Sequence, residues 1–190
     1  MSDNKIYEKL LSASAQYDGW LYIGDDKCRY VIGEPGRYNL LVIGINPSTA
    51  TPEKLDPTIR KVRKIVEQDQ VLGGWLMINL YPLRNKDPKE MPDQPDEELS
   101  RNNIAVIKEI MARYELWRIW AAWGDAIDTR DYYVEELKKI ESLSSGEWYH
   151  KGKMTRRGNP RHPLYLPDDA EFEWFPVADY ITLFSDKYLY

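Results

Sequence analysis

Residues 40–62 have the sequence LLVIGINPSTATPEKLDPTIRKV, which contains a strand, a loop and a helix in that order. The apolar run Leu40 to Ile45 ends at Asn46-Pro47, and a bounded run of this length is typical of a buried strand. Asp56-Pro57 then supplies an N-cap and a proline in the first helical turn. Apolar residues recur after it at helical spacing, at Ile59, Val62, Ile65 and Val66. The segment therefore predicts one strand–helix unit of an α/β fold.

Two further pairs of a strand and a helix follow along the chain. Residues 75–80 (WLMINL) and residues 118–123 form apolar runs of strand length. Each is followed by apolar residues at helical spacing: Ile104, Ile107, Ile110, Met111 and Tyr114 after the first, and Tyr133, Val134, Leu137 and Ile140 after the second. Strands that alternate with helices pair in parallel, with helices on both sheet faces. We therefore predict an α/β three-layer sandwich with a mainly parallel central sheet flanked by helices.

The segments on either side of this core differ from it. Residues 20–23 and 28–32 flank Gly24-Asp25-Asp26 and predict an N-terminal β-hairpin, added antiparallel to the sheet. Residues 148–190 are rich in proline, aromatic and charged residues, and we predict little regular structure there. Within them, residues 171–184 are expected to close the core rather than to contact a partner. The length of the chain predicts a single domain that spans residues 1–190.

Composition and charge exclude several classes of protein. One cysteine, Cys28, and two histidines are too few for an internal disulfide or a familiar zinc motif, so we expect no metal and no cofactor. The amino terminus lacks an apolar signal core, and no apolar run approaches the ~20 residues of a membrane span, which favours a cytoplasmic protein without membrane contact. The net charge of −5 provides no general attraction to nucleic acid, so any such contact must be local.

The working site is expected at the carboxyl ends of the parallel strands, where loops diverge and helix N-termini point their N–H groups outward. This rule selects residues 46–50, residues 79–84 and Gly124-Asp125. The candidate binding residues at these positions are Gly44, Ile45, Asn46, Pro47, Ser48, Asn79, Tyr81, Arg84 and Gly124.

The first two of these loops carry neutral amides. Asn46 lies in the sequence GINPSTA and can hold a polar ligand or a water, although Asn46-Pro47 can instead simply turn the chain, with Ser48 or Thr49 capping a helix. Asn79 ends an otherwise apolar strand, where its carboxamide offers a donor and an acceptor together, as reading the edge of a base requires. A structural asparagine satisfied by its neighbours is the alternative. The acids nearby, Asp56, Asp87 and Asp125, are expected to act as helix caps or turn residues.

A late segment adds a histidine and a run of basic residues. His162 lies between Arg161 and Pro163, and its pKa range suits proton or charge chemistry. His150 has no comparable setting and is expected at the surface. The basic residues Lys151, Lys153, Arg156, Arg157 and Arg161 lie in a stretch without an acid, and they either form a solvated loop or contact phosphates.

Four blocks of the sequence resemble the bacterial and phage family called domain of unknown function 1643: residues 40–62, 75–91 (WLMINLYPLRNKDPKEM), 121–124 (AAWG) and 158–166 (GNPRHPLYL). This resemblance implies a family core at about residues 40–166. The same blocks are distantly similar to the ordered motifs of the uracil-DNA glycosylase superfamily. In that superfamily a first-strand loop positions the attacking water, a second-strand asparagine reads the base, and a late loop containing His-Pro completes the site.

This distant resemblance implies a uracil-DNA-glycosylase-like fold and a role for each block. Asn46 would position the water, Asn79 would hydrogen-bond the Watson–Crick edge of an extruded pyrimidine, and His162 would stabilise the charge that develops on the departing base. Leu164 and Tyr165 would wedge into the gap, with the basic run holding phosphates beside them. The resemblance thus implies a hydrolase that acts on DNA or a nucleotide.

Two other classes of function remain open from the sequence. A non-catalytic module on the same fold would bind a nucleotide, single-stranded nucleic acid or a protein, and the acidic pI together with the absence of a carboxylate from the first loop favours it. A small-molecule hydrolase or transferase using Asp56 or Ser48 is the third hypothesis. The sequence leaves the oligomeric state open.

Overall fold

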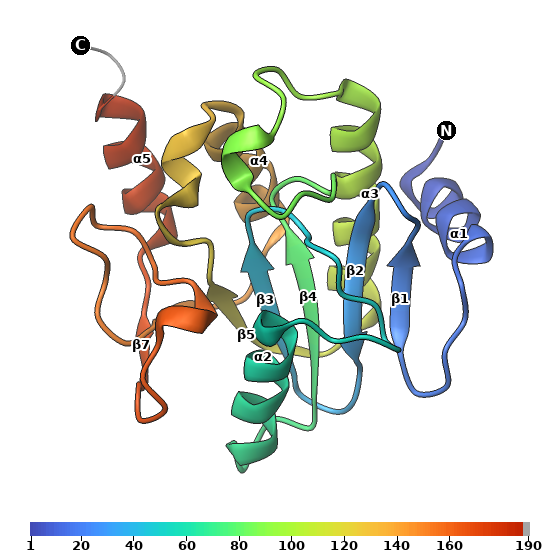
Figure 1. Ribbon diagram of the computed structural model, residues 1–190, viewed down its shortest axis with the longest axis horizontal. Coiled ribbons are helices and arrows are strands. Elements are labelled where there is room, and N and C mark those ends of the chain that lie inside the picture. The colour runs from blue at the N-terminus through green and yellow to red at the C-terminus, as the bar shows by residue number, and fades with distance from the viewer. Residues whose placement is uncertain (188–190) are drawn as a thin grey trace.

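The computed structural model describes residues 1–187 and shows an α/β fold around a seven-stranded sheet (Figure 1). The strand order is β1-β2-β4-β3-β5-β6-β7. The strands are β1 Leu21–Gly24, β2 Arg29–Glu34, β3 Asn39–Gly44, β4 Gly74–Asn79, β5 Leu116–Ala121, β6 Trp148–Lys151 and β7 Phe172–Trp174. The helices are α1 Asp3–Ala13, α2 Pro57–Gln68, α3 Glu97–Arg113, α4 Tyr132–Leu143 and α5 Val177–Lys187, with short 3-10 turns η1 Pro88–Glu90, η2 Gly124–Thr129 and η3 Pro163–Tyr165.

The sheet is mixed, and this corrects the prediction of a mainly parallel one. Its centre is parallel, because β3 pairs in parallel with both β4 and β5, and β5 pairs in parallel with β6. The predicted hairpin β1-β2 is confirmed and joins the sheet antiparallel to β4, while β7 adds an antiparallel strand at the other edge. The predicted parallel core is therefore present, but antiparallel pairs flank it on both sides.

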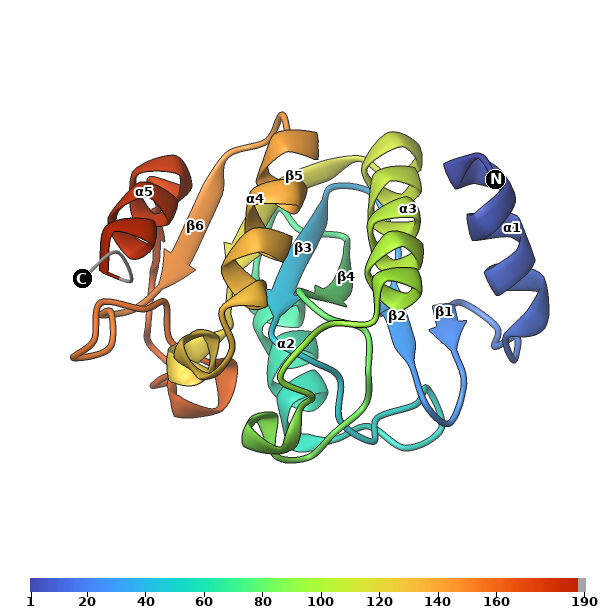
Figure 2. The ribbon, with the colours of Figure 1, turned by 90° about the horizontal axis from the view of Figure 1, so that it is seen from above.

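Helices cover both faces of the sheet, because successive strand residues point to opposite faces and each set is apolar. Leu41 and Ile43 of β3 belong to a core shared with α3, α4 and α5, whereas Leu40 and Val42 pack with residues of α2. Helix α2 lies in front of the sheet in Figure 1, and Figure 2 shows the row of α1, α3, α4 and α5 on the other side. No helix within residues 1–187 is long and apolar enough to cross a membrane.

The C-terminal segment contains more regular structure than we predicted. It supplies β6, β7 and α5, which local composition concealed because their apolar residues are separated by prolines and charges. Phe175, Ile181 and Phe184 are buried against the core, so the expectation that residues 171–184 close the core is confirmed. Helix α1 was not predicted either.

Candidate functional site

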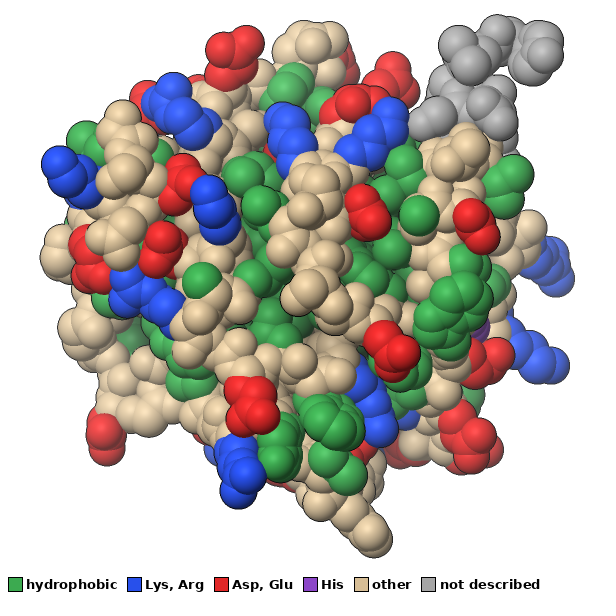
Figure 3. Space-filling view, turned by 180° about the vertical axis from the view of Figure 1, so that it is seen from behind, with side chains coloured by type: hydrophobic (Ala, Val, Ile, Leu, Met, Phe, Trp, Pro, Cys, Tyr) green, Lys and Arg blue, Asp and Glu red, His purple; other side chains and the backbone are tan. Residues whose placement is uncertain are grey.

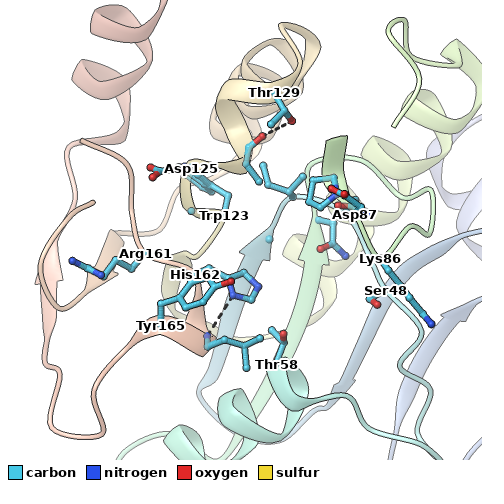
Figure 4. Close-up of a pocket in the computed structure, with 18 of the residues that line it drawn as sticks. Ser48, Thr58, Lys86, Asp87, Trp123, Asp125, Thr129, Arg161, His162 and Tyr165 are labelled. Atoms are coloured by element: carbon cyan, nitrogen blue, oxygen red, sulfur yellow. Dashed lines mark hydrogen bonds between the residues drawn. The ribbon is translucent and has the colours of Figure 1, made fainter. Parts of the chain in front are cut away.

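A cavity of about 910 Å³ opens at the carboxyl ends of β3 and β4. The start of α2, the turn η2 and the loop that carries His162 complete its wall. Figure 4 shows His162 and Tyr165 on one side of this space and Ser48 and Lys86 on the other. Segments far apart in the sequence therefore converge here because the parallel strands of the centre end at one edge of the sheet.

Most of the predicted site residues line this cavity. They are Gly44, Ile45, Asn46, Ser48, Asn79, Gly124, Arg156, Arg157, Arg161, His162, Leu164 and Tyr165. Five predicted residues are not in its wall: Pro47, Tyr81, Arg84, Lys151 and Lys153.

Asn79 occupies the floor of the cavity with its amide unsatisfied. The side chain at the end of β4 is 1% exposed, and neither Nδ2 nor Oδ1 has a hydrogen-bond partner in the part of the chain that the structure describes. A Cβ at Gly44 on the adjacent strand would lie 2.8 Å from Asn79 Oδ1, so only glycine leaves room for the amide there. Buried polar atoms nearly always have partners, which makes this amide a candidate for binding a ligand.

Asn39, at the opposite end of the same parallel core, shows how a structural asparagine is treated. It is fully buried, its Oδ1 accepts from Gly36 N at 2.8 Å, and its Nδ2 donates to Gly36 O and Glu115 O at 2.8 and 3.1 Å. The fold therefore satisfies one buried strand asparagine completely and leaves the side-chain amide of Asn79 without a partner among the described residues.

Asn46 is partly committed to the fold. Its Nδ2 donates to Asn85 O at 2.9 Å and to Pro47 O at 3.3 Å, which ties the first loop to the second. Of the side-chain amide, only the oxygen Oδ1 is left to face a ligand or a water. The helix that follows is capped by Asp56, whose Oδ1 accepts from Ile59 N at 2.9 Å, and not by Ser48 or Thr49.

Two of the three acids expected as caps or turn residues have this role. Asp56 caps α2, and Asp87 caps η1 by accepting from Lys89 N at 2.9 Å. Asp125 instead accepts from the side chains of Thr155 and Asn159, at 2.5 and 2.9 Å, because it holds the loop that carries His162. All three also line the cavity.

His162 faces the cavity as a neutral imidazole. Its Nδ1 accepts from Leu164 N at 3.4 Å, which starts the turn η3 and, in this tautomer, leaves Nε2–H as a donor (Figure 4). Burial lowers the pKa of His162, and the carboxylate of Asp56 opposes that shift. At neutral pH the ring can therefore donate a hydrogen bond without carrying a charge.

Gly124 allows the His162 loop to approach the strand end. Its φ of +65° lies in the region that favours glycine, and a Cβ there would be 3.2 Å from His162 Cβ. Gly124 N also donates to Pro160 O at 2.9 Å. The role of Gly124 is thus to position this loop.

Asn159 holds the base of the same loop, and sequence reasoning missed it. Its Nδ2 donates to Asp125 and Asp128 at 2.9 and 3.1 Å, and its Oδ1 accepts from the hydroxyl of Tyr180 at 2.8 Å. Its position three residues before His162 was the only signal in the sequence. Because α5 supplies Tyr180, the C-terminal helix helps to fix the cavity wall.

Arg29 is a second residue that the sequence did not reveal. It begins β2, is 2% exposed and lines the cavity, yet the only hydrogen bond of its guanidinium among the described residues runs from Nη1 to Ala50 O at 3.3 Å. Burial lowers its pKa to about 10, and the nearby Arg84 acts in the same direction, so Arg29 is charged at neutral pH. A hydrophobic strand context gave no reason to expect a cation here.

Two predicted contact residues are instead used by the fold. Arg84 donates to the carbonyls of Asp25, Ser48 and Ala50 and to the hydroxyl of Tyr22, which joins the hairpin to the first loop. Tyr81 is fully buried, and its hydroxyl accepts from Asp96 N at 2.8 Å.

The basic run divides between two places. Lys151 is buried, donates to Ala170 O and lies over the ring of Phe172, while Lys153 is exposed. In the cavity wall, Arg157 pairs with Asp128 at 3.2 Å, and Arg161 Nε donates to Lys153 O at 2.7 Å.

The other residues of this segment also differ in exposure. At the rim Leu164 is 44% and Tyr165 73% exposed. His150, expected at the surface, is buried, and its Nδ1 lies 2.8 Å from Gly152 O.

The fold and the site together define an α/β protein with a polar cavity at the carboxyl ends of its parallel strands. The chain belongs to the family described as protein of unknown function (DUF1643), whose profile matches residues 29–164. This span includes Arg29, Asn79 and His162. Among curated proteins, none matches the chain.

Proposed function

We propose that the cavity takes up a pyrimidine base and that the protein is a glycosylase-like hydrolase that processes nucleic acid. The unpartnered carboxamide of Asn79 carries this proposal. The Watson–Crick edge of a pyrimidine presents adjacent donor and acceptor groups, which complement the Oδ1 and Nδ2 of an asparagine. Each unsatisfied buried atom costs about 1–3 kcal/mol, and a bound base would remove that cost.

Two other side chains supply the chemistry in this proposal. When water attacks C1′ of the sugar, the glycosidic bond breaks and its electron pair moves to the base. The Nε2–H of neutral His162 would donate to the base oxygen on which this charge develops. Asn46 would orient the water through its free carbonyl oxygen, and the released base takes up a proton. The distant resemblance to the uracil-DNA glycosylase superfamily supports the same assignment.

The test is an assay for abasic sites in single-stranded and duplex oligonucleotides that carry uracil, mismatches and modified pyrimidines. We expect base release by the wild type, and its loss in Asn79→Ala and His162→Ala. His150→Ala is the matched control, because His150 is the other histidine and is not in the cavity wall. Release that persists in both cavity variants would assign the activity to a contaminant and refute the proposal.

A binding module without catalysis is the second candidate. The observation that favours it is the commitment of Asn46 Nδ2 to two backbone carbonyls, in a loop without a carboxylate. Asp56, the acid in the wall near His162, already caps α2. Without a free carboxylate to deprotonate the water, the cavity would hold a nucleobase and leave its glycosidic bond intact.

Binding measurements separate the two candidates. Titration of a labelled oligonucleotide over a salt series reports the phosphate contacts, since each one changes the slope of log K against log[salt] by about 0.7 for single strands. A binding module predicts affinity that survives Asn46→Ala, with a smaller slope after Arg156→Ser. An affinity that does not depend on salt or on Arg156 would exclude phosphate contacts by this part of the wall.

A further inference from the structure

Arg29 is a buried cation that makes no direct ion pair within residues 1–187, although the carboxylate of Asp56 is near enough to act on its pKa. No carboxylate of residues 1–187 comes within 4.0 Å of its guanidinium, and its Nε has no hydrogen-bond partner there. The one bond that the guanidinium makes, to Ala50 O at 3.3 Å, is shared with Arg84, which donates to the same oxygen at the same distance. A structural role would normally satisfy a buried guanidinium with a carboxylate or several carbonyls, because burying an isolated charge is costly.

The surroundings of Arg29 are also positive. Six cationic side chains line the cavity, namely Arg29, Lys86, Lys89, Arg156, Arg157 and Arg161, against the three carboxylates of Asp56, Asp87 and Asp125. The whole chain has a net charge of −5. Figure 3 shows the molecule from behind relative to Figure 1, and on that face acidic and basic side chains are interspersed with hydrophobic ones. The positive excess at the cavity is therefore local, as expected for a site that attracts an anion.

Arg29 and Asn79 serve different parts of the cavity. Asn79 leans toward β3, where its Oδ1 would lie 2.8 Å from a Cβ at Gly44. Arg29 comes from β2, on the other side of β4, and reaches the carbonyl of Ala50 in the loop that precedes α2. A volume of about 910 Å³ accommodates more than a single base. The cavity thus has room for two chemically different groups of one ligand.

We propose that Arg29 binds a phosphate group, which forms a second subsite beside Asn79. A guanidinium presents several N–H donors in a plane that matches phosphate oxygens. Because Arg29 is 2% exposed, the phosphate at this depth is a terminal one, since a diester would need two chain exits from the same enclosed place. The ligand class that follows is a pyrimidine nucleotide with a terminal phosphate, either free or at the 5′ end of a strand, and this part of the inference rests on the proposed function at Asn79.

The test measures affinity by calorimetry for three probes: inorganic phosphate, deoxyuridine and deoxyuridine 5′-monophosphate. We expect the wild type to bind phosphate, and to bind the monophosphate at least tenfold more tightly than the nucleoside. Arg29→Met should abolish phosphate binding and equalise the two other affinities. Arg101→Met is the matched control, because it removes one positive charge from an exposed position on α3, outside the cavity, and should behave as the wild type.

Several outcomes would overturn the phosphate subsite: no phosphate binding by the wild type, equal affinities for nucleoside and monophosphate, or unchanged phosphate binding by Arg29→Met. If Arg29→Met does not fold, Arg29→Gln replaces it, because glutamine removes the charge but keeps a polar side chain, and an unchanged phosphate affinity in that variant would also refute the subsite. An oligonucleotide that needs its 5′-phosphate and outcompetes the monophosphate would support a strand end as the source of the terminal phosphate, and the reverse order would support a free nucleotide. Phosphate binding by the wild type together with a deoxyuridine affinity that does not respond to Asn79→Ala would instead count against base recognition, so the two proposals fail separately.

Discussion

Replacing Asn79 by leucine should stabilise the protein without ligand. The two side chains are similar in size, but leucine carries no polar atom into a place where Nδ2 and Oδ1 have no partner among the described residues. Each unsatisfied atom costs about 1–3 kcal/mol. Contact of the branched side chain with the neighbourhood of Gly44 offsets part of the gain, so we expect the free energy of unfolding to rise by about 2 kcal/mol.

Urea denaturation and thermal unfolding measure this change. For a chain of this length, about 2 kcal/mol corresponds to a rise in Tm of roughly 4–8 °C. Asn39→Leu is the matched control, since it removes a buried strand asparagine that makes three hydrogen bonds. Because these three hydrogen bonds are lost, Asn39→Leu should lower the free energy of unfolding by about 3 kcal/mol. The same substitution should therefore have opposite signs at the two ends of the parallel core.

A destabilised Asn79→Leu variant would refute this reasoning. It would mean that the amide of Asn79 is satisfied within the folded protein, and the main support for a base-reading residue would be lost. A stabilised variant that also loses ligand binding would show that the fold tolerates an unfavourable side chain for the sake of function.

Three further predictions concern the His162 loop and the thiol. Burial lowers the pKa of His162 from its usual 6.5, so as the pH falls the imidazole is protonated in the unfolded chain before it is protonated in the folded one. The free energy of unfolding should therefore decrease as the pH falls from about 6.5 to the folded-state pKa. Denaturation of His162→Gln across pH should show a flatter profile, and an equally steep one would contradict the argument. Gly124→Ala should lower the free energy of unfolding by about 1 kcal/mol and reduce base release, because it strains a φ of +65° and crowds His162; unchanged stability and activity would exclude that positioning role. Burial raises the pKa of Cys28 to about 11, so a thiol reagent at pH 8 should label it only after unfolding, and rapid labelling of the folded protein would disprove its burial.

The candidate site was predictable as far as local pattern and topology reach. Asn46 and Asn79 were expected at one edge of the sheet because each follows a strand run. His162 was expected beside them because of the motif resemblance of its loop. Their contacts were not predictable. Arg84 looked available to a ligand but donates to three carbonyls of other segments, and the partners of Asn159 come from η2 and α5.

By itself the sequence determined the elements of the parallel core except β6, since apolar period, caps and turn residues act over a few neighbouring positions. Asp56 caps α2 as its spacing to Ile59 predicts. Only the tertiary structure decided which polar groups are left without partners. The burial of Arg29 depends on the antiparallel docking of β2 against β4, and the isolation of Asn79 depends on Gly44 of the adjacent strand. Such properties arise from long-range pairing, whose outcome no local pattern contains.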